Sequence, residues 1–370
     1  MTRRSVLRSC GLLGAALAAA FQVSPVSAAG SFVGGLSSIS TIASTFPANG
    51  DVNPYGIAVV PRTIGDLTAG DVLVSNFNAV SNLQGTGTTI VEISPKGSRR
   101  VFAHIDPSHL PGRCPGGVGL TTALSVLPHG FVVVGSLPTT DGTAATAGAG
   151  CLIVLDREGR LVETIAGRQI NGPWDMTAVP TEDGADLFVT NVLNGTVVAN
   201  GAVVNRGTVV RIELRIERGE APEEMARTVI GSGFAERTDA TALVIGPTGL
   251  GLGRDGTLFV ADSLNNRIAA IPDALHRPGT AFAGRDVSAN GALNDPLGLT
   301  IAPNGHILTV NGADGNLVET TPHGAQVAVK QLDGTGLPPG AGALFGIAIA
   351  PRGAGVYFVD DAANTLDLLR

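Results

Sequence analysis

The chain has 370 residues, a formal net charge of −7, and 44% hydrophobic but only 4% aromatic residues. An acidic chain with few aromatic residues is a poor candidate for binding nucleic acid or an anionic membrane surface. The length allows a sizeable hydrophobic core, and the 51 glycines are typical of a turn-rich β protein.

The N-terminal segment has the features of an export signal. The sequence Thr2-Arg-Arg-Ser-Val-Leu-Arg8 resembles a twin-arginine motif, an apolar run from Gly11 to Phe21 follows it, and Val26-Ser-Ala28 fits a cleavage site. The apolar run is too short to span a bilayer, so we expect no membrane span. We therefore predict that residues 1–28 direct the protein to the periplasm or the outside of the cell, and that residues 29–370 form a single domain.

The rest of the chain consists of short predicted strands. A first strand, Ile39–Phe46, belongs to no repeat. Outer strands are then predicted at Thr88–Ile93 and Arg99–His104, Cys151–Asp156 and Leu161–Ile165, Thr208–Leu214 and Ala226–Ile230, Arg267–Ile271 and Thr280–Ala283, Leu317–Thr321 and Gln326–Lys330, and Thr365–Leu369. Because the last group has one strand fewer than the others, we expect Ile39–Phe46 to complete it.

Six copies of one unit become visible when the chain is aligned on the end of the first strand of each copy. That end falls on Pro61, Pro128, Pro180, Arg254, Pro303 and Pro351. Five residues earlier lies the first-strand column, which consists of Gly56, Ala123, Asp175, Gly249, Gly298 and Gly346. The second strand ends on the strand-end column, which consists of Asn76, Ser136, Asn191, Asp262, Asn311 and Asp361. Six short β-rich units predict an all-β, six-bladed β-propeller, with the N-terminal strand closing the ring.

Two cysteines remain outside the predicted signal, Cys114 and Cys151, and both fall in the second copy. In an oxidising compartment we expect them to form a disulfide, which would contribute roughly 4 kcal/mol on the chain-entropy model. The alternative is two separate buried thiols.

The fourth copy carries a resemblance to a known family. Pro247-Thr-Gly-Leu opens its first strand, Asp255-Gly256 forms its hairpin, and Val260-Ala-Asp-Ser-Leu-Asn-Asn-Arg-Ile268 follows. These motifs resemble NHL-repeat propellers. The resemblance implies an exported binding scaffold, whose partner would be a small molecule or an envelope protein or peptide. We expect a monomer, and no cofactor is predicted.

One face of the predicted ring collects the strand-two to strand-three loops, three of which are long: Ala79–Gly87, Leu137–Gly150 and Val192–Gly207. These loops could wall a ligand pocket at the mouth of the central channel. The candidate ligand-binding residues are Tyr55, Trp174, Asp175, Thr248, Leu297 and Phe345. Asp175 is a carboxylate in a column of small residues, but the simpler interpretation is that it accepts backbone hydrogen bonds at the start of a strand.

The strand-end column has two possible roles. Asp and Asn at strand ends commonly cap turns, but oxygens converging on an axis would also suit Ca²⁺ or a similar divalent cation. The segment from Gly249 to Ser263 also resembles gluconolactonase-like propellers. By that resemblance Asp262 would be a metal ligand, Asn191 a possible companion, and the protein a metal-dependent hydrolase of lactones. The sequence favours the binding scaffold and leaves open whether the protein is an enzyme.

Overall fold

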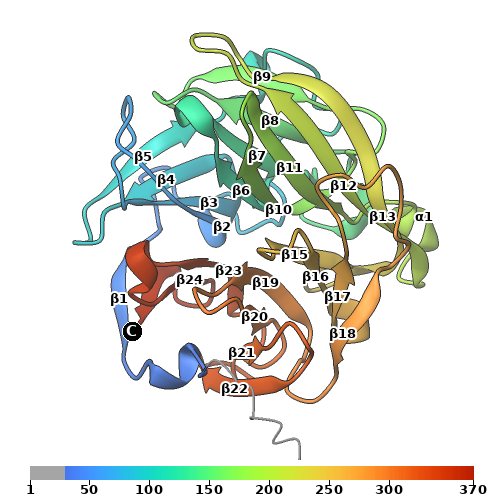
Figure 1. Cartoon of the computed structure of the whole chain (residues 1–370). Coiled ribbons are helices and arrows are strands. Elements are labelled where there is room, and N and C mark those ends of the chain that lie inside the picture. The colour runs from blue at the N-terminus through green and yellow to red at the C-terminus, as the bar shows by residue number, and fades with distance from the viewer. Residues whose placement is uncertain (1–29) are drawn as a thin grey trace, which may run out of the picture. The chain divides into compact units, whose positions relative to one another are not determined.

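The computed structural model describes residues 30–370, and Ser31–Arg370 form one compact unit. Six antiparallel sheets are arranged around a central axis, which confirms the predicted all-β six-bladed propeller (Figure 1). The predicted export signal, residues 1–28, lies outside the described residues. Between residues 30 and 370 no helix is long and apolar enough to cross a bilayer.

Each blade is one antiparallel sheet whose first four strands follow one another outward from the axis. The blades are β2 (Val52–Val59), β3 (Val72–Asn78), β4 (Thr89–Ile93) and β5 (Arg99–His104); β6 (Leu120–Val126), β7 (Val132–Ser136), β8 (Cys151–Leu155) and β9 (Leu161–Ile165); β10 (Pro173–Pro180), β11 (Gly184–Asn191), β12 (Val204–Arg215), β13 (Glu223–Asp239) and β14 (Leu243–Ile245); β15 (Pro247–Leu252), β16 (Leu258–Asp262), β17 (Arg267–Ile271) and β18 (Arg285–Ala289); β19 (Pro296–Ile301), β20 (Ile307–Asn311), β21 (Asn316–Thr320) and β22 (Gln326–Gln331); and β23 (Leu344–Ile349), β24 (Val356–Asp360), β25 (Thr365–Leu369) and β1 (Ile39–Ser44). The only α-helix among residues 30–370 is α1 (Thr196–Ala199), and short 3₁₀ turns lie at Val33–Gly35, Pro107–His109, Pro128–Gly130, Ala144–Thr146, Ser263–Asn265 and Pro351–Gly353.

The ring closes as the sequence predicts. Strand β1, from the start of the described chain, pairs antiparallel with β25 and becomes the outer strand of the sixth blade. In Figure 1 the blue N-terminal strand lies beside the red C-terminal blade. This pairing joins the two ends of the chain, so the last blade has its full set of four strands.

Two outer strands differ from the prediction. The fourth blade ends with Arg285–Ala289 instead of Thr280–Ala283, because Phe282 and Gly284 adopt φ values of 53° and 69° and interrupt an extended strand there. In the third blade, the predicted strand Ala226–Ile230 is the middle of the much longer β13, which continues beyond β12 to pair with β14. That extension carries the chain onto the face of the ring that holds the candidate site.

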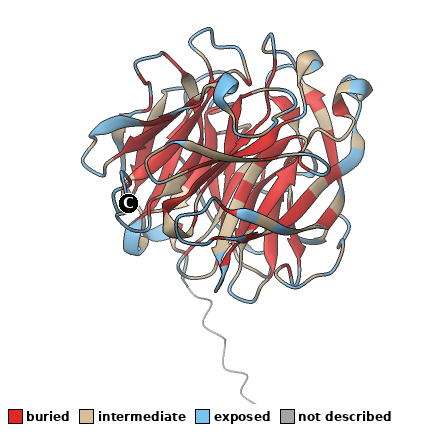
Figure 2. Cartoon of the chain, turned by 90° about the horizontal axis from the view of Figure 1, so that it is seen from above, coloured by how far each residue is buried: buried red, intermediate tan, exposed pale blue. Residues whose placement is uncertain are grey.

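The first-strand column shows why small residues recur next to the axis. A Cβ atom on Gly298 would lie 2.0 Å from the carbonyl oxygen of Phe345, and one on Gly346 would lie 2.4 Å from that of Tyr55. Both distances are far inside van der Waals contact, so the backbones of successive blades can approach only where the side chain is absent. The inner and middle strands are buried and the outer loops are exposed (Figure 2).

The predicted disulfide is confirmed. Cys114 and Cys151 form a bond with a Cα–Cα distance of 5.3 Å and a sequence separation of 37 residues. It ties the segment before β6 to the start of β8, and Cys151 is fully buried. The second blade is thus cross-linked on the same face of the ring as its long loop.

Candidate functional site

A cavity of 630 Å³ lies on the loop face, where the first strands begin and the second strands end. Its walls come from the segment around β2, the β3–β4 loop, the start of β10, the β13–β14 turn, the start of β19, the end of β20, the β22–β23 connection and the end of β24. The lining residues are Asn53, Tyr55, Asn78, Asn82, Gln84, Trp174, Asp239, Thr241, Ala242, Val244, Ile245, Asp295, Leu297, Gly312, Ala313, Leu337, Pro338, Ala341, Gly342, Phe345 and Asp361. We call this the loop-face cavity.

The prediction about the long loops is correct only for Ala79–Gly87, which contributes Asn82 and Gln84. Neither Leu137–Gly150 nor Val192–Gly207 lines the loop-face cavity. Two other segments take their place, the β13–β14 turn and the β22–β23 connection. The sequence could not show this, because a loop's length does not say whether it folds over the axis or outward.

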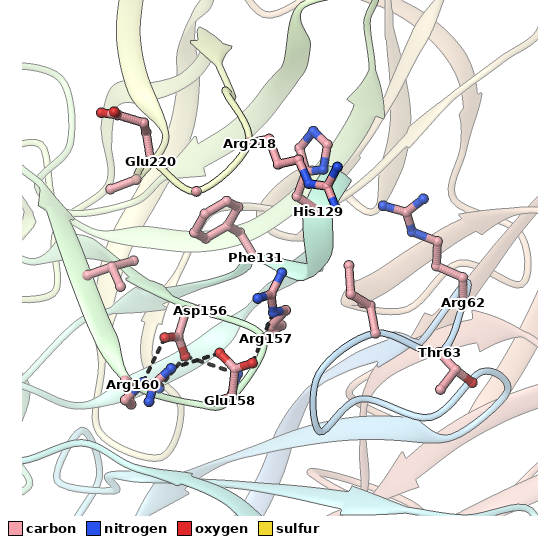
Figure 3. A pocket seen from close by; sticks show the side chains of 14 residues that line it. Arg62, Thr63, His129, Phe131, Asp156, Arg157, Glu158, Arg160, Arg218 and Glu220 are labelled. Atoms are coloured by element: carbon pink, nitrogen blue, oxygen red, sulfur yellow. Dashed lines mark hydrogen bonds and ion pairs between the residues drawn. The ribbon is translucent and has the colours of Figure 1, made fainter.

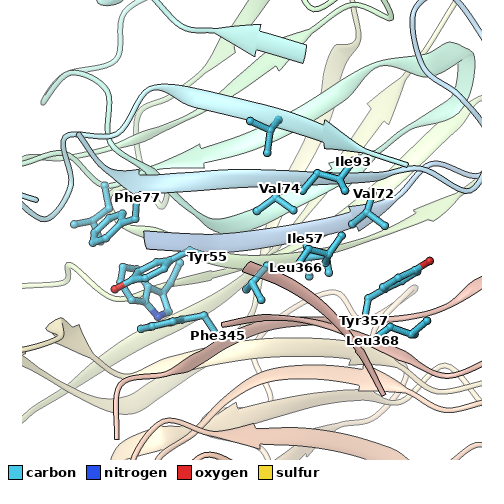
Figure 4. Packing of buried hydrophobic residues seen from close by; sticks show 14 of the residues in the cluster. Tyr55, Ile57, Val72, Val74, Phe77, Ile93, Phe345, Tyr357, Leu366 and Leu368 are labelled. Atoms are coloured by element: carbon cyan, nitrogen blue, oxygen red, sulfur yellow. The ribbon is translucent and has the colours of Figure 1, made fainter. Parts of the chain in front are cut away.

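An aromatic cluster forms one wall of the loop-face cavity. The ring of Tyr55 stacks between Phe77 and Phe345, with centroid distances of 4.5 Å and 3.7 Å (Figure 4). Trp174 meets the rings of Tyr55 and Phe77 edge-on, at 6.1 Å and 5.7 Å. These rings belong to the core cluster between the first, third and sixth blades, so their positions are fixed by packing.

Several polar groups of this wall have no partner among residues 30–370. The Tyr55 hydroxyl and the Trp174 indole N–H make no hydrogen bond, although these side chains are only 3% and 2% exposed. Asn78 is 1% exposed, and its Oδ1 also lacks a partner, whereas its amide nitrogen donates to Asn82. Buried polar groups are usually paired, so the unpaired Oδ1 of Asn78 marks a place where a partner is missing, and the two donors beside it are open to the cavity.

Asp361 was expected in the strand-end column, and the structure corrects this. Leu344 pairs with Asp360, just as Pro247 pairs with Asp262 and Pro296 with Asn311. The true member of the column is therefore Asp360, which accepts a hydrogen bond from the N–H of Ala363 and caps the turn. Asp361 lies one residue further along, and its carboxyl group lines the loop-face cavity.

The carboxyl group of Asp361 has no hydrogen bond or ion pair within the described part of the chain, and its Oδ1 is buried. Burial raises the pKa of Asp361 to about 8, and the negative charge of Asp360 acts in the same direction. Burial also raises the pKa of Tyr55 well above its usual value, and the charge of Asp361 adds to that effect. The two side chains thus share one poorly solvated corner of the cavity.

Asp295 is a second unpaired carboxylate in the same cavity. It precedes β19 with a φ of 54°, a conformation that is uncommon outside glycine, and its N–H donates to the side chain of Asn266. Its own Oδ1 is buried without a partner. Burial raises the pKa of Asp295 to about 6; the negative charge of Asp239 helps, and Arg237 opposes. Sequence reasoning missed this residue, because one aspartate before a proline resembles any turn residue.

Asp239, the third aspartate of the cavity, is fully engaged. Its carboxylate accepts hydrogen bonds from the N–H and hydroxyl of Thr241 and forms an ion pair with Arg237 at 2.8 Å. Burial acts to raise its pKa, but the hydrogen bonds from Thr241 and Ala242 outweigh that effect and hold the pKa below the usual value. Asp239 therefore holds the β13–β14 turn in place as a wall of the cavity.

The predicted ligand-binding residues separate into three places. Tyr55, Trp174, Leu297 and Phe345 line the loop-face cavity together. Thr248 does not line it. This residue is buried, and its hydroxyl group joins the fourth and fifth blades through contacts with Ser263 and with the backbone oxygen of Pro296, both at 3.1 Å.

Asp175 lies in a separate inner channel of 290 Å³, formed by the first strands of the blades. Its Oδ1 accepts a hydrogen bond from the N–H of Met176, as a strand-start acceptor would. Burial raises the pKa of Asp175 to about 8, against the effect of that hydrogen bond. Asp175 and Trp174 are neighbours in sequence, but they line different cavities.

The two predicted metal ligands are already occupied by protein groups. Asp262 is fully buried, and its carboxylate accepts hydrogen bonds from Asn265 and an ion pair from Arg267 at 2.7 Å. The side-chain oxygen of Asn191 accepts from the N–H of Asn171. Within residues 30–370, no three His, Cys, Asp or Glu side chains gather closely enough to hold a metal ion. The residues do not fit a cation in this arrangement, since it would have to displace the guanidinium of Arg267.

A second hollow, the hairpin-face cleft, lies at the opposite ends of the strands and measures 560 Å³. It is formed by the hairpins of the first three blades. Its charges are largely paired with one another, because Arg160 binds Asp156 and Glu158 at 2.9 Å each and Arg157 binds Glu158 at 2.9 Å (Figure 3). Exposed pairs of this kind are ordinary surface chemistry.

Solved structures with a similar fold belong to proteins of different activities. A calcium-binding protein, regucalcin, from Agrobacterium tumefaciens matches with a TM-score of 0.57 and 14% identity, over 90% of this chain and 93% of that one. A gluconolactonase from Xanthomonas campestris matches with a TM-score of 0.53 and 13% identity, over 90% and 88%. A streptogramin B lyase matches with a TM-score of 0.54 and 16% identity, over 90% and 97%.

At these identities the likeness shows the propeller fold alone. No family profile matches the chain, and no curated protein matches its sequence. The NHL-repeat resemblance therefore holds as far as the propeller fold and no further. The choice of function has to come from the cavity itself.

Proposed function

We propose that the protein binds a small molecule in the loop-face cavity and acts as a binding protein. The observation that carries the proposal is the pair of unpartnered donors, the Tyr55 hydroxyl and the Trp174 indole N–H, on a wall that core packing holds rigid. A ligand that supplies an acceptor would give each donor a hydrogen bond, which contributes about 0.5–1.5 kcal/mol. The cavity volume of 630 Å³ lies in the usual range for small-molecule sites.

The single tryptophan of the chain provides a direct test, since Trp174 lines the cavity. A ligand that enters should change the intensity or wavelength of its fluorescence. The Ala313→Phe variant, which fills the cavity, should lose this response. The matched Ala221→Phe variant, in the hairpin-face cleft, should keep it. The proposal fails if a broad metabolite collection changes the fluorescence of neither protein. It also fails if the collection changes the fluorescence of the wild type and of Ala313→Phe equally.

Hydrolysis of a lactone or ester in the same cavity is the second candidate. It is favoured by the presence of two carboxyl groups whose pKa values are raised to about 6 and about 8, so that near pH 7 one accepts a proton and the other donates one. Turnover of a lactone and ester panel, measured with and without a chelator, tests this candidate. Loss of turnover on chelation would support a metal-dependent enzyme, and loss in Asp361→Asn without any effect of the chelator would support a metal-independent one.

We further propose that the protein is exported to an oxidising compartment as a monomer. The disulfide supports this, because such bonds persist in the periplasm and outside the cell. Cell fractionation of the full chain should find the protein outside the cytoplasm. A double Arg3→Lys, Arg4→Lys variant should be retained inside. Equal export of that variant would rule out a twin-arginine route.

A further inference from the structure

Every charged side chain that lines the loop-face cavity is acidic. Its lining holds three aspartates, Asp239, Asp295 and Asp361, and no lysine, arginine or histidine. The hairpin-face cleft of the same protein holds four arginines and a histidine beside its acidic residues. The negative lining is therefore not common to every hollow of the protein, although the overall charge is −7.

Only two of these aspartates are available to a ligand. Asp239 is neutralised by Arg237 and held by Thr241. Asp295 and Asp361 accept no hydrogen bond and form no ion pair with any residue between 30 and 370, and in each the Oδ1 atom is buried. An unpaired carboxylate in such surroundings is costly, and a cation would remove the cost.

A bare metal ion does not suit this arrangement. The three aspartates line one cavity but do not gather into a group able to hold a metal. They come from different blades, with Asp295 before β19, Asp361 after β24 and Asp239 at the end of β13. An organic cation extends beyond its charged group, so that group can reach one carboxylate while the rest of the molecule lies elsewhere in the cavity.

The aromatic wall of the cavity indicates what the rest of the molecule is. Tyr55 and Trp174 are at least 97% buried and present a hydroxyl group and an indole N–H without partners. Beside them Leu297, Val244 and Phe345 offer apolar surface. A ligand that satisfies this wall carries an acceptor oxygen and an apolar stem.

We propose that the loop-face cavity recognises an organic cation, a molecule with an amino group that pairs with Asp361 and Asp295 and a stem that lies against the aromatic wall. This inference rests on the proposed binding function and names its ligand class. The carboxylates provide selectivity for charge, and the aromatic wall provides the fit to the stem.

The probes are α,ω-diamines from butane to decane, compared with the diols of the same length. Binding is followed by Trp174 fluorescence and by calorimetry at pH 8, with calcium chloride as a separate probe. We expect at least one diamine to bind ten-fold or more tightly than its diol, with an optimum chain length and a loss of affinity in salt. Asp361→Asn and Asp295→Asn should each weaken the diamine about ten-fold and leave the diol unchanged. The matched control is Glu220→Gln, in the hairpin-face cleft, which should change neither the diamine affinity nor the diol affinity.

The possible outcomes separate the two proposals. Diols that bind as tightly as diamines would overturn the organic-cation class while leaving a small-molecule cavity. No binding of any diamine, or binding unaffected by either Asn variant, would also overturn the class, and the metabolite screen would then decide the binding function alone. Calcium binding that is lost in Asp361→Asn would replace the organic cation with a metal. The Asn variants keep the size of the side chain, and a thermal melt confirms that they are folded.

Discussion

The two faces of the propeller treat charge in opposite ways. At the hairpin-face cleft, Arg157, Glu158, Asp156 and Arg160 neutralise one another along a single hairpin. At the loop-face cavity, Asp295 and Asp361 line the same cavity, and neither has a counterion among the described residues. Pairing within a hairpin stabilises the fold locally, whereas an unpaired buried carboxylate weakens it.

This difference is the reason why we propose a function for the loop-face cavity and not for the hairpin-face cleft. The two hollows are similar in size, 630 Å³ and 560 Å³, so volume does not separate them. What separates them is whether the polar groups are already satisfied. Polar groups that lower the stability of the folded protein because they are unpaired are characteristic of ligand-binding sites.

The largest effect on stability should come from the disulfide, and it should leave ligand binding intact. Replacing Cys114 and Cys151 with serine removes the constraint on a 37-residue separation, which is worth about 4 kcal/mol of unfolding free energy. Neither cysteine lines the loop-face cavity. Urea unfolding should show the loss, while ligand titration of the folded variant should match the wild type. A parallel loss of affinity would mean that the second blade shapes the cavity.

Asp361→Asn should stabilise the free protein in alkaline solution. The folded pKa of about 8 lies above the unfolded value of 3.8, so the folded state holds the proton more tightly, and stability falls as pH rises between about 4 and 8. The full difference between the two pKa values corresponds to roughly 6 kcal/mol, and we expect about 2 kcal/mol because the side chain also faces cavity water. Urea unfolding at pH 9 should show the gain, and the two proteins should converge below pH 4. A variant less stable at pH 9 would contradict an unpaired carboxylate.

Asp156→Asn, on the hairpin face, should have the opposite sign. Burial acts to raise the pKa of Asp156, but hydrogen bonds from Arg160 and Glu158 outweigh it and hold the pKa below its usual value. The contribution of Asp156 to the free energy of unfolding is present above the pKa of the unfolded state and is lost as pH falls through the pKa of the folded state. We expect a loss of about 1 kcal/mol at pH 7 that disappears in strong acid. A loss that is the same at every pH would mean that shape, and not charge, matters here.

The smallest effect should come from Arg62→Gln in the hairpin-face cleft. Arg62 is exposed and has no ion pair among residues 30–370. We expect a change within about 0.5 kcal/mol in the thermal or urea unfolding curve, and unchanged Trp174 fluorescence on ligand addition. A clear drop in ligand response would show that the two faces are coupled and would break the comparison.

Much of the structure could be predicted from residue patterns because those patterns are repeated. Glycine beside the axis is required wherever two blade backbones approach, so Gly298 and Gly346 appear at matching positions of the repeat. The closing strand β1 followed from counting strands, and the disulfide followed from the two cysteines outside the predicted signal. The gathering of Tyr55, Trp174 and Phe345 followed from their common place at the start of the first strands.

The departures from the repeat were decided only by the tertiary structure. In the sixth blade the strand pairing is shifted by one residue from the predicted alignment. Asp360 therefore caps the turn, and the side chain of Asp361 lines the cavity, although both aspartates lie at the end of the strand. Whether a carboxylate is paired depends on groups far away in sequence, such as Arg267 for Asp262 or Arg237 for Asp239. The sequence thus determines the ring, because local periodicity and backbone packing repeat in every blade. The acidic loop-face cavity arises from unrepeated loops that meet only when the ring closes.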